Sequence, residues 1–96
     1  MSVVLEQAVR IPTDVICREL QGEAVILNLA SSTYFGLDQV GTRVWQLCET
    51  HGSLQAVWEA MQQEFDAPRE MLRSDLLAFV DELLANGLLA VDQQAA

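Results

Sequence analysis

The sequence predicts an α+β domain, in which a three-stranded antiparallel sheet is followed by three helices. Between residues 15 and 37, apolar and polar residues alternate, which is typical of strands that bury one face. From residue 38 onward the apolar spacing becomes three and four, which is typical of amphipathic helices. The chain has 96 residues, 51% of them hydrophobic, so it fits one domain with its own core.

The predicted sheet is a meander of three strands. Gln21-Gly22-Glu23 forms a hairpin connection, in which glycine supplies the turn. Ser31-Ser32 turns the chain again, and the strand that follows carries the aromatic pair Tyr34 and Phe35. The three strands are predicted at residues 15–20, 24–29 and 33–37. Three strands are enough for a stable sheet once helices cover one face.

The three predicted helices are delimited by capping and breaking residues. Asp38 and Ser53 are favourable N-caps, because their side chains accept hydrogen bonds from free backbone N–H groups. Gly87 occupies a position where a helix commonly ends in a left-handed residue. The helices are predicted from Asp38 to about Thr50, from Ser53 to the break at Ala67-Pro68, and from about Arg69 to Asn86.

The two ends of the chain are expected to be less ordered than the domain between them. We predict a flexible N-terminus over residues 1–8, one domain over residues 9–91 and a frayed tail over residues 92–96. Within the domain, Val9 to Ile11 is expected at a sheet edge, because Pro12 cannot donate to a central ladder. Leu88 to Val91 is expected to fold back onto the core.

Each helix has an apolar face that we expect to be buried. The first directs Val40, Val44, Leu47 and Cys48 inward, and the second presents Leu54, Val57, Trp58, Met61 and Phe65 as one stripe. We expect Trp45 and Trp58 to anchor the core. The apolar arc of the third helix spans about 160°, wider than one buried face requires. This helix therefore either carries a second contact surface or is more fully wrapped by a small domain.

Composition argues against nucleic-acid and membrane partners. The net charge is −9, there is no lysine, and the five arginines are scattered along the chain. A nucleic-acid surface requires clustered cations to neutralise phosphates. No segment reaches the roughly 18 consecutive apolar residues of a membrane span, and no signal sequence is evident. We therefore expect a cytoplasmic protein.

The sequence offers no constellation for catalysis, a cofactor or a metal ion. His51 is the single histidine and lies at a predicted helix end beside Gly52, so no nucleophile–base pair is apparent. Cys17 and Cys48 are far apart in the chain and are interpreted as small buried residues. One histidine and two separated cysteines do not form a credible zinc site. We expect a protein that is not an enzyme.

Several short motifs follow one another along the chain: V-I-L-N-L (25–29), T-Y-F-G-L-D (33–38), G-T-R-V-W-Q-L (41–47) and D-L-L-A-F-V-D-E-L-L-A-N-G-L-L (75–89). Taken in order, these motifs resemble the PqqD family, whose members recognise leader peptides in the biosynthesis of ribosomally made natural products. The resemblance covers roughly residues 9 to 91. It implies a winged-helix-like fold, and its three strands followed by three helices agree with the order of elements predicted from the residue pattern.

The resemblance also implies a mode of binding. The leader of a precursor peptide adds as a strand to the third strand, and its apolar side chains enter a groove beside the third helix. Carried over to this sequence, the edge consists of Thr33, Tyr34, Phe35 and Gly36, and the groove uses some of Leu72, Leu76, Phe79 and Val80. Arg73 and Asp75 are expected to pair with leader charges. Phe35 and Leu37 share one strand face, so a buried Phe35 leaves Tyr34 exposed as a contact.

Three functions remain open at this stage. The first is a recognition element (an adaptor) that presents a leader peptide to a modifying enzyme or leader peptidase, in a lasso-peptide pathway. The second is a peptide chaperone in the biosynthesis of pyrroloquinoline quinone. The third is a self-associating module, in which the sheet edge pairs with another copy to form a homodimer. A DNA-binding winged helix is disfavoured, because the third helix carries two arginines against four acidic residues.

Overall fold

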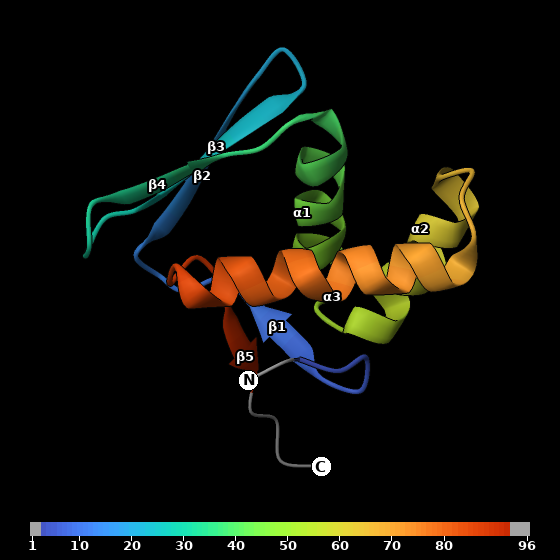
Figure 1. Ribbon diagram of the computed structural model, residues 1–96. Coiled ribbons are helices and arrows are strands. Elements are labelled where there is room, and N and C mark those ends of the chain that lie inside the picture. The colour runs from blue at the N-terminus through green and yellow to red at the C-terminus, as the bar shows by residue number, and fades with distance from the viewer. Residues whose placement is uncertain (1–2, 93–96) are drawn as a thin grey trace.

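The computed structural model describes residues 3–92 and confirms the predicted α+β architecture (Figure 1). Two small antiparallel sheets and three helices make up this described part of the chain. In sequence order, the elements are β1 (Ala8–Arg10), β2 (Val15–Leu20), β3 (Glu23–Asn28), β4 (Thr33–Gly36), α1 (Gln39–His51), α2 (Leu54–Glu64), α3 (Arg69–Ala85) and β5 (Ala90–Asp92).

The larger sheet is the predicted meander, with β3 at its centre and β2 and β4 at its edges. A two-residue turn connects β2 to β3, and both of its residues have positive φ, 56° at Gln21 and 82° at Gly22. Such turns match the natural twist of a hairpin. One face of the sheet buries Ala24 and Ile26, each 0% exposed, against the helical part of the molecule. The sheet and α2 lie on opposite sides of α1 (Figure 1).

The predicted caps are present in the structure. Asp38 accepts a hydrogen bond from the backbone N–H of Gly41 at 2.8 Å, and Ser53 accepts one from Ala56 at 3.3 Å. Gly87 ends α3 with a φ of 72°, and the next N–H, from Leu88, donates to the Leu83 carbonyl at 2.9 Å. A side chain at position 87 is disfavoured twice, because a Cβ there would also lie 3.2 Å from the Asn28 amide nitrogen.

A continuous core joins the sheet, all three helices and the ends of the described chain. Trp45 is 1% exposed and Trp58 is 6% exposed, so both predicted anchors are buried. α3 contributes one buried row to this core: Leu72, Leu76, Val80 and Leu83. Leu77, Phe79 and Leu84 are only partly buried. The wide apolar arc of α3 therefore has a buried centre and two partly open flanks.

The smaller sheet pairs two segments whose partnership the sequence did not indicate. β1 runs antiparallel to β5, with Val9 opposite Val91, and this pairing brings the two ends of the domain together. Val3 is buried, and its backbone N–H donates to Asp81 Oδ1 at 3.0 Å. Asp92, the first residue of the predicted tail, pairs with Ala8. The remainder of the tail (93–96) and residues 1–2 of the predicted flexible N-terminus lie outside the described residues.

Candidate peptide-binding site

An open groove of about 500 Å³ lies between the end of β4, the start of α1, the end of α2 and one face of α3. Most of its lining is apolar. The complete lining consists of Gly36, Leu37, Asp38, Val40, Gly41, Val44, Met61, Phe65, Ala67, Leu72, Asp75, Leu76 and Phe79. A concave apolar surface with a few polar groups is the usual form of a ligand site.

The groove brings together half of the residues singled out from the sequence. Gly36, Leu72, Asp75, Leu76 and Phe79 line it. Thr33, Tyr34 and Phe35 lie on β4, which leads to the groove. Val80 is 0% exposed and does not line the groove, so in this structure it is a core residue. A peptide-contacting role for each of these residues stays a prediction.

The backbone of β4 has one hydrogen-bonding side directed away from the sheet. The Leu37 N–H donates to the Ala24 carbonyl at 2.7 Å, so these two residues form a hydrogen-bonded pair. Hydrogen-bonded and non-hydrogen-bonded pairs alternate along an antiparallel ladder. Given the register of β3 and β4, Phe35 and Thr33 bond to β3, whereas the N–H and C=O groups of Tyr34 and Gly36 point outward. This edge can accept another strand.

The side chains of β4 alternate between core and solvent. Phe35 packs against the core, and Leu37 is 6% exposed, so the predicted inward face is confirmed. Tyr34 is 74% exposed on the opposite face. An exposed tyrosine at a strand edge offers a large apolar ring with a polar tip to a partner.

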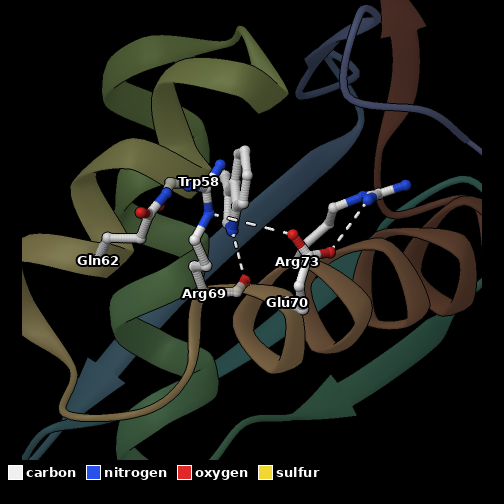
Figure 2. Close-up of polar contacts among 5 residues, drawn as sticks. All are labelled: Trp58, Gln62, Arg69, Glu70 and Arg73. Carbon is white, nitrogen blue, oxygen red and sulfur yellow. Dashed lines mark hydrogen bonds and ion pairs between the residues drawn. The ribbon is translucent and has the colours of Figure 1, made fainter.

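Arg73 lies apart from the groove, although the sequence grouped it with Asp75. It donates to Glu70 Oε1 at 3.1 Å and lines two smaller hollows beside Leu77 instead. Figure 2 shows Arg73 next to Glu70, near the stacked pair Arg69 and Trp58. The Arg69 guanidinium is 5.2 Å from the centre of the Trp58 ring, and Trp58 Nε1 donates to the Arg69 carbonyl at 2.8 Å.

The sequence did not indicate how much α1 and α2 contribute to the groove. Val40, predicted to face inward, is 57% exposed and lines the groove opening. Met61 and Phe65 belong to the apolar stripe of α2, which gave no sign that its last turn is left partly uncovered. No local signal in the sequence marks this opening, because periodicity assigns an inward face without showing where neighbouring elements leave it uncovered.

Charges near the groove are fixed by a bidentate ion pair between α1 and the end of α2. Arg43 Nε and Nη2 donate to the two carboxylate oxygens of Glu64 at 2.7 and 2.8 Å. The hydrogen bonds from Arg43 hold the pKa of Glu64 below its ordinary value. Glu64 directly precedes Phe65, so this pair ties one wall of the groove to α1.

Burial raises the pKa of both thiols, and the described residues include no metal-binding cluster. Burial raises the pKa of the Cys48 thiol to about 12, and burial is also the main cause of the raised pKa of Cys17. Among residues 3–92, no group of three or more His, Cys, Asp or Glu side chains is arranged to hold a metal ion. Within the same range, every helix is too short or too polar to cross a membrane.

The fold and site together define a small α+β domain with an open strand edge that leads to an apolar groove. The family described as coenzyme PQQ synthesis protein D (PqqD) matches residues 23–89, and the chain belongs to this family. No curated protein matches the chain.

Two solved structures are similar over most of the chain. One is the structure of TbiB1 in complex with the TbiA(beta) leader peptide. Its sequence is 31% identical to this chain, the TM-score is 0.79, and the match covers 91% of this chain and 99% of that chain. A lasso peptide synthetase B1 complexed with its leader peptide is 21% identical, with a TM-score of 0.76, covering 85% of this chain and 96% of that one. The second likeness supports the fold alone.

Proposed function

We propose that this protein is a non-catalytic adaptor for lasso-peptide biosynthesis. It binds the leader peptide of a ribosomally synthesised precursor as an added strand on β4 and presents the precursor to a modifying enzyme or leader peptidase. The 31% identity to TbiB1, which is similar over nearly its whole length and is complexed with a leader peptide, supports this assignment.

The observation that carries the proposal is the adjacency of an unpaired strand edge and an apolar groove. The outward N–H and C=O groups of Tyr34 and Gly36 supply main-chain hydrogen bonds that any extended peptide can use. The groove begins at Gly36 and selects among peptides by their side chains. Backbone pairing for affinity and side-chain pockets for selection are the two parts of recognition by strand addition.

Fluorescence anisotropy with labelled leader peptides tests this function. The leader peptide bound by lasso peptide synthetase B1 represents the lasso-peptide pathway, and the leader of a pyrroloquinoline quinone precursor represents the alternative in the family's description. Saturable binding of the first supports the proposal, and preferential binding of the second assigns the protein to the quinone pathway as a peptide chaperone. Binding of neither at high protein concentration contradicts leader recognition.

Three variants distinguish edge pairing from other modes of binding. Tyr34→Pro removes an outward N–H, Tyr34→Thr removes the ring but keeps this donor, and Glu19→Pro removes an outward N–H from β2 at the opposite edge. A lost hydrogen bond of about 1.4 kcal/mol corresponds to about a tenfold weaker affinity. We expect this loss for Tyr34→Pro and not for Glu19→Pro, with folding verified by circular dichroism.

The same β4 edge offers a route to a homodimer. Two copies carry −9 each, so their long-range electrostatic interaction is repulsive at low salt. We expect a monomer at low salt, and any dimer that forms through β4 should dissociate when a leader peptide is added. Sedimentation with and without peptide measures both effects.

A further inference from the structure

The groove is acidic as well as apolar. Of its thirteen lining residues only Asp38 and Asp75 are charged, and both are carboxylates. They come from different elements, because Asp38 precedes α1 and Asp75 lies within α3. A ligand that fills the apolar part of the groove therefore meets negative charge contributed by two separate elements.

Among the residues that the structure describes, no cationic side chain lines the groove to neutralise these carboxylates. None of the five arginines belongs to the lining. Arg43, on α1, is engaged by Glu64. Arg69 lies over the ring of Trp58, and Arg73 pairs with Glu70 (Figure 2).

The two carboxylates differ in how far they are already engaged. Asp38 caps α1 and accepts the Gly41 N–H at 2.8 Å, so part of its hydrogen-bonding capacity is used. Asp75 is exposed, and within residues 3–92 it takes part in no side-chain hydrogen bond or ion pair. Asp75 is therefore available to a ligand without the loss of an internal contact.

We propose that the groove selects leader peptides in which a lysine or arginine lies two positions from the apolar side chain that enters the groove, and that Asp75 pairs with this cation. This inference rests on the proposed leader-binding function and specifies its substrate class. Successive side chains of the added strand point to opposite faces, so residues two positions apart share a face. One register therefore directs an apolar side chain into the groove and places the side chain two positions away on the same face, where a long basic side chain can reach Asp75.

Local pairing is distinct from general attraction between an acidic protein and a basic peptide. The overall charge of −9 attracts every basic peptide, whichever position carries the cation, and salt weakens this attraction. A contact with Asp75 depends on position. We expect moving the cation along the peptide to weaken binding by up to about fivefold, the upper end of the range for a solvent-exposed ion pair.

Selection from a displayed library of random short peptides tests the proposal without requiring a known leader. The protein is used as its full chain, in four forms: wild type, Asp75→Asn, Asp75→Arg and the control Glu59→Gln. Glu59 is exposed on α2 and outside the groove, so this control removes the same charge elsewhere. Asp75 is also exposed, so both substitutions should leave the fold intact, and thermal melts check this.

The expected result is a reciprocal change in selected sequences. Wild type and Glu59→Gln should enrich Lys or Arg at one fixed offset from an apolar residue. Asp75→Asn should lose this preference, and Asp75→Arg should enrich Asp or Glu at the same offset. Peptides from the wild-type selection, remade with norleucine for lysine, should bind wild type up to about fivefold more weakly and Asp75→Asn unchanged.

Two negative outcomes have different meanings. Enrichment of apolar residues without a charge preference, or with a preference that survives in Asp75→Asn, overturns the role of Asp75 but leaves leader binding intact. Enrichment of no peptide by any of the four proteins contradicts leader binding itself and overturns this inference with it.

Discussion

Replacing Thr42 tests how the sheet is held against α1. Thr42 is the one buried polar side chain among the described residues, at 3% exposed, and its Oγ1 accepts the backbone N–H of Ala24 at 2.8 Å. Ala24 is itself 0% exposed and lies in β3. The Ala24 N–H cannot reach water unless the sheet opens. The Ala24 carbonyl accepts the Leu37 N–H, and Leu37 lines the groove, so the position of Ala24 also supports the groove.

Thr42→Val keeps the shape of the side chain and removes the acceptor. A buried N–H left without a partner costs about 1–3 kcal/mol. For a domain of this size each kcal/mol lowers the melting temperature by about 4–8 °C, so we expect a decrease of roughly 10 °C. Thr42→Ser is the matched control, because it keeps the hydroxyl and removes only a methyl group.

Urea unfolding followed by circular dichroism measures the free energy of unfolding of all three proteins. We expect Thr42→Val to be clearly less stable than Thr42→Ser, with similar dependence on urea concentration. If Thr42→Val is as stable as Thr42→Ser, the Oγ1 contact does not hold the sheet in place, and this account of the groove's support is wrong.

Two further predictions concern the titrating groups. The pKa of Glu64 is lowered in the folded protein, so the stabilisation from Arg43 is complete above its ordinary value of 4.5 and disappears as the pH falls through the folded value. Urea unfolding should therefore show Arg43→Met to be destabilised near neutral pH, with a difference from wild type that shrinks in acid; a constant difference would contradict this. Cys48, whose pKa burial raises to about 12, should react with iodoacetamide far more slowly than the less buried Cys17 in the native protein, and equal labelling by mass spectrometry would be inconsistent with the packing around α1.

Local patterns in the sequence were enough to predict most of the fold. Alternation gives the strands, and the caps at Asp38, Ser53 and Gly87 are local hydrogen-bonding devices. The pairing of β1 with β5 could not be found in this way, because three-residue strands some 80 positions apart carry no local signal of partnership. The prediction recognised each segment and missed their contact.

The groove was less predictable than the fold, for two physical reasons. Periodicity assigns an inward face, but it does not reveal where neighbouring elements leave that face uncovered, which is the case at Val40 and Phe65. Grouping Arg73 with Asp75 overlooked helix geometry, since positions two apart differ by about 200° around a helix. Arg73 accordingly faces Glu70, whereas Asp75 lines the groove.

Amide hydrogen exchange by NMR, with and without a bound leader peptide, tests strand addition most directly. The two edges of the sheet provide an internal control: Tyr34 and Gly36 have outward N–H groups on β4, and Cys17 and Glu19 have them on β2. We predict that the leader slows exchange at Tyr34 and Gly36 and leaves Cys17 and Glu19 unchanged. Slowed exchange at the β2 edge, or at neither edge despite saturation with peptide, would contradict binding by strand addition to β4.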